Sequence, residues 1–143
     1  MELVIFIIAV VFGLVVYFYS QKVKNSKNLE RNYYYKRFLR NKLQSEKNIK
    51  QLGKIIEFAD GDYFIMTRSG IIDLQKYHLQ LQSDYLSDYS AAVLKKIKNN
   101  NLKRKDRKRH AKMLINQSEK LYNTEVNIAQ FQLRLKEVNY ISV

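Results

Sequence analysis

The side chains that most often do chemistry in proteins are few in this sequence, and they are widely scattered. The 143 residues include no Cys, which excludes disulfides, thiolate metal sites and cysteine nucleophiles. Neither of the two histidines, His78 and His110, has a partner at the spacing of a nucleophile–base pair or of metal ligands. We therefore predict a protein without catalytic activity, cofactor or metal, in which His78 has a structural or surface role.

Two acidic residues, Asp60 and Asp62, flank Gly61 and suggest the start of a calcium-binding loop. An EF-hand loop needs further acidic ligands and a Glu near its twelfth position, whereas this sequence continues with Arg68 and Ser69. We predict a turn here rather than a metal site.

The strongest chemical signal is positive charge, because 26 Lys and Arg against 13 Asp and Glu give a net charge of +13. Residues 21–54 and residues 95–112 each carry a net +9, and the intervening residues 55–94 carry a net −4. The second block contains a dense basic cluster, which consists of Lys103, Arg104, Lys105, Arg107, Lys108, Arg109 and Lys112. Clusters of this kind bind acidic proteins, anionic lipids and nucleic acids.

Three interpretations of the basic cluster remain open. Docking to a partner protein or to anionic lipid comes first, non-specific binding of nucleic acid second, and a solvated helix start third. Aromatic side chains that would stack on bases are absent between residues 101 and 112, and so is a Gly-rich phosphate loop. Sequence-specific recognition of nucleic acid therefore has no support.

A single apolar run precedes both basic blocks. Residues 3–19, LVIFIIAVVFGLVVYFY, contain no charged side chain, and as a helix they span about 26 Å, close to the ~30 Å hydrocarbon core of a bilayer. The basic start and small-residue cleavage site of a signal peptide are absent. We predict that residues 1–21 form a transmembrane anchor, whose membrane-contacting residues include Leu3, Phe6, Ala9, Gly13, Tyr17, Phe18 and Tyr19.

The flanks of this run predict its orientation. Lys22, Lys24 and Lys27 follow the run closely, and no basic residue precedes it. The positive-inside rule places the N-terminus outside and the C-terminal domain on the cytoplasmic side, or in the matrix or stroma of an organelle. Ala9 and Gly13 have the spacing that lets two membrane helices approach, which is compatible with a homo-oligomer.

Residues 22–53 predict a basic juxtamembrane helix, because apolar side chains recur about every 3.5 residues between positions 35 and 56. This helix either lies on anionic lipid or continues the anchor as a solvated stalk. The residues expected to contact anionic lipid or a partner are Lys22, Lys24, Lys27, Lys36, Arg37 and Arg40.

Residues 54–143 predict a small α+β domain. Asp-Gly at 60–61 and Ser-Gly at 69–70 divide β-branched and aromatic runs. This pattern predicts a meander of three short strands at residues 54–58, 62–68 and 71–74. Two helices, residues 75–98 and residues 102–140, then flank three consecutive Asn residues, which favour a turn.

The last predicted helix carries a repeat of seven. Its leading positions are apolar and half of its companion positions, such as Gln117 and Thr124, are polar. The pattern is typical of a coiled-coil strand or of an antiparallel mate for residues 75–98, and we favour the antiparallel hairpin. The predicted interaction stripe consists of Leu114, Leu121, Ile128, Phe131 and Leu135.

The sequence thus predicts a mainly α protein with one N-terminal transmembrane helix, a juxtamembrane helix, a short β-meander and a C-terminal helical hairpin. The leading functional hypothesis is a non-catalytic accessory, assembly or scaffold subunit of a membrane complex, with the bilayer and other subunits as partners. The first alternative is a membrane tether that binds nucleic acid or ribosomes non-specifically. The second is a phage-type lysis or exclusion protein.

Overall fold

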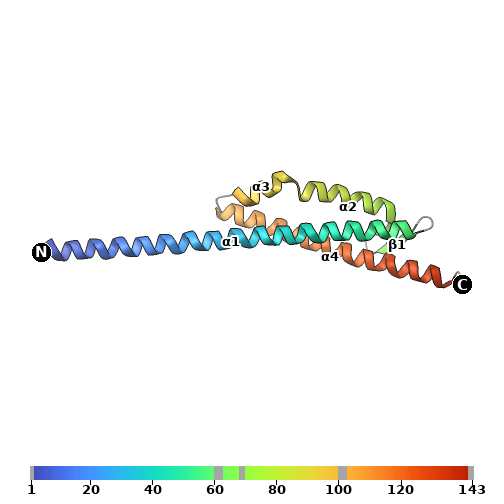
Figure 1. The fold of residues 1–143 in the computed structure, drawn as a ribbon, viewed down its shortest axis with the longest axis horizontal. Coiled ribbons are helices and arrows are strands. Elements are labelled where there is room, and N and C mark those ends of the chain that lie inside the picture. The colour runs from blue at the N-terminus through green and yellow to red at the C-terminus, as the bar shows by residue number, and fades with distance from the viewer. Residues whose placement is uncertain (1, 60–62, 68–69, 100–102, 142–143) are drawn as a thin grey trace.

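The computed structural model describes residues 2–59, 63–67, 70–99 and 103–141, and these residues are mainly helical (Figure 1). The elements in order are α1 (Glu2–Phe58), β1 (Phe64–Thr67), β2 (Gly70–Asp73), α2 (Leu74–Asp88), α3 (Ala91–Asn99) and α4 (Arg104–Ile141). The prediction of a mainly α chain with a small antiparallel sheet and C-terminal helices is confirmed.

The first element, α1, is one uninterrupted helix of 57 residues. The chain contains no Pro, and isolated Gly residues within a helix do not break it. The predicted anchor and juxtamembrane helix therefore lie in a single helix. The predicted strand at residues 54–58 is wrong, because these residues complete α1. Ile55 lies one helical turn after Leu52 on the buried side, and this burial outweighs the β-propensity of Ile.

The strands β1 and β2 form a two-stranded antiparallel hairpin in which Thr67 pairs with Gly70. Two of the three predicted strands form. β1 lies within the predicted strand at residues 62–68, and β2 overlaps the predicted strand at residues 71–74 but begins and ends one residue earlier. Gly70 has a φ of 121°, which L side chains rarely adopt and which explains Gly at this position. The predicted turn and its neighbours lie outside the described residues, namely Asp60, Gly61, Asp62, Arg68 and Ser69.

The helix predicted at residues 75–98 is divided into α2 and α3. Asp73 begins α2 as its N-cap, with its carboxylate accepting a hydrogen bond of 2.7 Å from the backbone N–H of Lys76. Tyr89 ends α2 with φ −117° and ψ 24°, and its ring packs 5.5 Å from the ring of Phe38. The break therefore falls where an aromatic side chain turns into the core.

The second half of α1 packs against α2, α3 and α4 in a bundle of three helical layers. α4 runs in the same direction as α1, whereas α2 and α3 run the opposite way (Figure 1). Arg107 pairs with Glu30 near the start of α4, and Asn41 donates to Gln117 farther along. The predicted hairpin of residues 75–98 and 102–140 is therefore part of a larger bundle, in which α4 packs mainly on α1.

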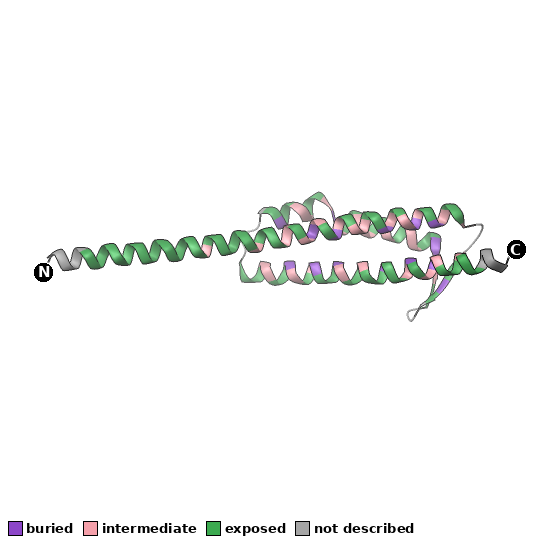
Figure 2. Ribbon diagram, turned by 60° about the horizontal axis from the view of Figure 1, so that its bottom comes forward, coloured by how far each residue is buried: buried purple, intermediate pink, exposed green. Residues whose placement is uncertain are grey.

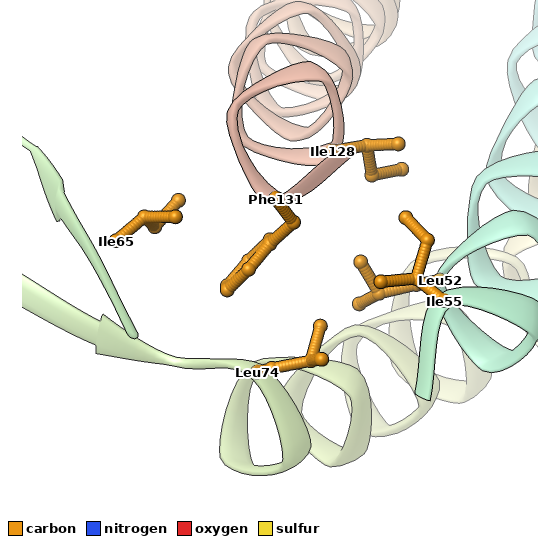
Figure 3. Packing of buried hydrophobic residues seen from close by; sticks show 6 residues of the cluster. All are labelled: Leu52, Ile55, Ile65, Leu74, Ile128 and Phe131. Carbon is orange, nitrogen blue, oxygen red and sulfur yellow. The ribbon is translucent and has the colours of Figure 1, made fainter. Parts of the chain in front are cut away.

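Two apolar clusters fill the bundle. The distal cluster, farther from the N-terminus, consists of Leu52, Ile55, Ile65, Leu74, Ile128 and Phe131 (Figure 3). The proximal cluster consists of Phe38, Tyr89, Ile97 and Leu114. Within the interaction stripe of α4, Leu114, Ile128 and Phe131 are buried, and Leu121 and Leu135 are partly buried. This stripe therefore faces the inside of the bundle.

A polar layer lies between the two clusters. Asn41, Asn48, Gln117 and Thr124 are buried there, with exposed fractions of 6% or less. The side-chain amide of Asn41 donates to Oε1 of Gln117 at 3.4 Å, and Nε2 of Gln117 donates to the backbone carbonyl of Asp88 at 3.2 Å. Buried polar pairs of this kind favour one register of neighbouring helices over others.

The first half of α1 projects beyond the bundle, and the colouring of Figure 2 shows its described residues as exposed, apart from the partly buried Val23. Near its N-terminus, this helix is long and apolar enough to cross a membrane, and none of that stretch is buried against the rest of the chain. We call residues 7–29 the projecting segment.

Candidate functional site at the basic end of the bundle

α2 and α3 run back along α1, so α4 begins at the end of the bundle where α1 enters it. The two basic blocks of the sequence therefore lie at the same end of the bundle. α3 ends and α4 begins beside the part of α1 that leaves the bundle toward the N-terminus (Figure 1). Residues 22–40 and 95–112, which we call the basic end, hold seventeen Lys and Arg and two acidic side chains. The rest of the chain holds nine and eleven, so all the excess positive charge lies at the basic end.

Most of the predicted contact residues are exposed on this surface. On α1 they are Lys22, Lys24, Lys27, Lys36 and Arg40, and on α4 and just before it they are Lys103, Arg104, Lys105, Lys108, Arg109 and Lys112. Lys and Arg side chains at this density produce a strong positive potential that attracts anions.

Two predicted contact residues instead hold helices together. Arg37 is partly buried and donates to the Tyr33 hydroxyl at 3.0 Å and to Oγ of Ser118 at 3.4 Å. Nε of Arg107 lies 3.4 Å from Oε2 of Glu30 in an ion pair. Both guanidinium groups therefore link α1 to α4, and the exposed cations around them are better placed to meet an external anion.

His110 is buried beneath the basic end, with 4% of its surface exposed. Its ring lies 6.0 Å from that of Tyr34, whose hydroxyl donates to Oε1 of Glu30 at 3.1 Å. Burial lowers the pKa of His110, and Arg109 lowers it further while Asp106 opposes the shift. Burial and the neighbouring Glu30 raise the pKa of Tyr34. A neutral His110 thus helps to seat the first turns of α4 on α1.

The basic end lies close to the apolar stretch along the helix axis. Glu30, the partner of Arg107, lies about 16 Å from Tyr19 at a rise of 1.5 Å per residue. Because α4 runs parallel to α1, Lys103 lies one turn nearer, at about 10 Å from the level of Tyr19. The exposed lysines of residues 22–27 occupy the interval.

The predicted anchor residues lie on the projecting segment and the turns before it. Ala9, Gly13, Tyr17, Phe18 and Tyr19 are exposed. A Cβ added at Gly13 would meet nothing within 4 Å, so the helix surface is open there. Leu3 and Phe6 lie in α1, but their side chains are outside the described ones.

A second apolar stripe on α4 was not identified from the sequence. It consists of Ile115, Tyr122, Val126 and Leu133, whose side chains are between 39% and 67% exposed. Their heptad-like spacing places them on one face of the helix. The buried stripe has the same repeat of seven and begins one residue earlier, at Leu114. The two patterns therefore overlap in the sequence, and only the buried one was identified. We call the four exposed residues the outer stripe.

The described residues contain no group of three His, Cys, Asp or Glu side chains that could hold a metal ion. His78 is partly buried beside α1, where a Cβ added to Gly53 would lie 3.7 Å from its Nε2. Asp60 and Asp62 lie outside the described residues.

No known protein family, curated protein or solved structure matches this chain.

Proposed function

We propose that the protein is a non-catalytic single-pass membrane protein that acts as a scaffold, assembly or accessory subunit of a larger membrane complex. The observation that carries this proposal is the continuity of α1 from the apolar stretch into the bundle. A continuous helix has a fixed rise and a fixed turn per residue. It would therefore fix both the distance of the bundle from the bilayer and the rotation of the bundle about the helix axis. A subunit that positions other subunits needs such a link.

The apolar stretch supports a membrane span. It is exposed and apolar along its length, and a helix that is apolar on all sides is stable in lipid or in a large protein core. Tyr17, Phe18 and Tyr19 would then lie at the boundary between the hydrocarbon core and the headgroups, where aromatic rings are favoured. The basic residues that follow favour a topology with the bundle on the cytoplasmic, matrix or stromal side and the N-terminus outside.

The outer stripe supports the binding of another subunit. It extends about 27 Å from Ile115 to Leu133 at the rise of an α-helix. Apolar side chains that repeat along one helix face are suited to pack against a helix of a partner. The partner would approach from the side of the bundle, which leaves the basic end free.

The continuity of α1 can be tested in the exposed turns between the apolar stretch and the bundle. Asn25, Ser26 and Asn28 are exposed there. A triple Gly variant weakens the local helix by about 3 kcal/mol relative to a matched triple Ala variant. Both variants keep the length, the charge and the apolar stretch of the wild-type chain.

The measurement is cross-linking in native membranes, followed by purification through a C-terminal tag. We expect the wild-type and triple Ala proteins to recover the same membrane subunits and the triple Gly protein to recover less of them. Recovery of no other subunit with the full chain would refute the proposal, as would full recovery by a variant lacking residues 3–19. Protease digestion of the tag in sealed vesicles of known orientation tests the predicted topology.

A further inference from the structure

We propose that the basic end binds the headgroups of anionic lipids in the leaflet nearer to the bundle, from which the projecting segment leaves the membrane. This inference rests on the membrane span in the proposed function. It assigns the basic end to a negatively charged lipid surface rather than to an acidic protein or a nucleic acid.

The first argument is the asymmetry of charge along the molecule. Farther along α4, Lys120 has acidic partners on α2, where it lies 2.8 Å from Asp88 and 3.5 Å from Asp84. At the basic end, seventeen cations face two acidic side chains, of which Glu30 is already engaged by Arg107. A layer of anionic headgroups on the N-terminal side of the bundle would supply the missing counter-charge.

The second argument is distance. With Tyr19 at the edge of the hydrocarbon core, Lys103 lies about 10 Å above it. The headgroup region occupies roughly 5–7 Å of that interval, and the remainder is within the Debye length of about 8 Å at physiological ionic strength. An extended Lys or Arg side chain spans such a gap, so the contact needs no bend in α1.

The third argument is the placement of cations at the start of α4. Arg104 and Lys105 occupy its first turn beside the acidic Asp106, although cations are unfavourable at the positive end of a helix dipole. The backbone N–H groups of a first turn also attract phosphate. A layer of lipid phosphates would offset the repulsion among these cations.

Nucleic acid fits this surface less well. Residues 103–112 contain no aromatic side chain on which a base could stack. The interval of about 10 Å between the levels of Tyr19 and Lys103 is narrower than the major groove of DNA alone, at ~12 Å. A flat layer of headgroups enters this interval, whereas a duplex does not.

Lysine acylation in nanodiscs tests the proposal with the full chain. The purified protein is placed in phosphatidylcholine alone or with about 30% phosphatidylglycerol, which lowers the surface potential. A short pulse of an amine-reactive reagent is followed by mass spectrometry. The basic-end reporters are Lys103, Lys105 and Lys108, and the distal controls, which are also exposed, are Lys47, Lys50 and Lys54.

We expect the reporters to react several-fold more slowly in the anionic nanodiscs and the distal controls to react at the same rate in both. Salt at about 1 M, where the Debye length falls to ~3 Å, should restore the faster rate. Equal rates in both lipids, or the same change in reporters and controls, would overturn the proposal.

A matched pair of variants separates position from net charge, with Lys96 and Lys98 of α3 as the reporters. The basic-end variant is Arg104→Gln, Lys105→Gln, Lys108→Gln and Arg109→Gln, and the distal variant is Lys47→Gln, Lys50→Gln, Lys54→Gln and Lys76→Gln. Protection by phosphatidylglycerol should be lost in the first variant and kept in the second. Circular dichroism checks that both variants remain helical. If either variant loses helical structure, the salt response of the wild-type chain still tests the proposal.

Two further outcomes are distinguishable. If a short nucleic acid duplex protects the reporters in phosphatidylcholine more than phosphatidylglycerol does, the basic end is a nucleic-acid site and the proposal is overturned. If the chain fails to enter nanodiscs, the membrane span and the proposed function fail with it. Partner subunits are absent from the assay, so their identity does not affect the result.

Discussion

The distal and proximal halves of the bundle share the same three helical layers but are filled differently. The distal cluster contains six buried apolar residues, including Ile65 from the hairpin, and is mainly aliphatic. The proximal cluster contains four, of which Phe38 and Tyr89 are aromatic, and the buried His110 lies beside it. The proximal half also carries the basic end.

This difference indicates that the two halves contribute unequally to stability. Buried apolar area favours folding, and like charges placed close together oppose it. We therefore expect the distal half to supply most of the free energy of unfolding, and the backbone amides of the proximal half to exchange with solvent faster. The half of the bundle that we expect to be less stable is therefore the half in which the positive charge is concentrated.

The largest effect should follow from a cavity in the distal cluster. Phe131 is 1% exposed, and a Phe131→Ala substitution should lower the free energy of unfolding by about 3–5 kcal/mol. Chemical denaturation in detergent, followed by circular dichroism, measures the change. The control is Leu133→Ala on the same helix, which is 61% exposed and should change stability by about 0.5 kcal/mol or less. Similar losses in both variants would contradict the burial of Phe131 in the distal cluster.

A smaller effect should follow from changes in the polar layer. A Gln117→Leu substitution leaves the Asn41 amide and the Asp88 carbonyl without this partner, which should cost about 1–3 kcal/mol. The double variant Asn41→Leu/Gln117→Leu should lose less than the sum of the two single variants, because the amide left unpaired is also removed. Additive losses would show that the layer does not couple α1 to α4.

Acid should weaken the proximal half through His110. Its pKa is lowered by burial in the folded state, so the unfolded chain takes up a proton first as the pH falls through the ordinary value of 6.5. Stability should therefore fall as the pH drops from neutral through the folded pKa of His110. The measurement is denaturation of wild type and His110→Gln at about pH 7.5 and about pH 5.5.

The His110→Gln variant should lose less stability on acidification than the wild-type chain. A His78→Gln variant keeps His110 in place and should retain the wild-type response. If His110→Gln responds to acid as the wild type does, His110 is not the group responsible for the acid response.

The smallest effect should follow from the ion pair between Glu30 and Arg107. Its side chains are 28% and 42% exposed, and such pairs contribute about 0.2–1 kcal/mol. A Glu30→Gln substitution should mainly speed hydrogen exchange in the first turns of α4. Its matched control is Glu137→Gln in the exposed pair with Arg134, for which we expect no measurable change in global stability. A larger loss of stability from Glu137→Gln than from Glu30→Gln would contradict the expectation that the Glu30–Arg107 pair contributes more than the Glu137–Arg134 pair.

The long helices were predictable because the chain lacks Pro and its apolar residues follow a helical period. The predicted helix at residues 102–140 differs from α4 by no more than two residues at either end. The strand predicted at residues 54–58 failed because local β-propensity competed with a distant contact. Leu52 and Ile55 join a cluster with Ile128 and Phe131, and no local pattern reveals that partner.

The composition of the basic end was predictable, but its assembly was not. The sequence shows two basic blocks, and only the parallel arrangement of α1 and α4 brings them to one end. That arrangement depends on contacts such as Asn41 with Gln117, which are 76 residues apart. The sequence also did not reveal that Arg37 serves the fold, because its partner Ser118 is equally remote.

The pairing of α1 with α4 also sets an order of events during synthesis. Asn41 and Gln117 are 76 residues apart, so at a translation rate of about 5–20 residues per second Gln117 is made roughly 4–15 s after Asn41. Until α4 is made, which takes most of that interval, the core-facing side of α1 from Phe38 to Ile55 has none of its α4 neighbours. A nascent chain therefore exposes this face to chaperones and to other nascent chains, and its bundle closes only after α4 has emerged from the ribosome.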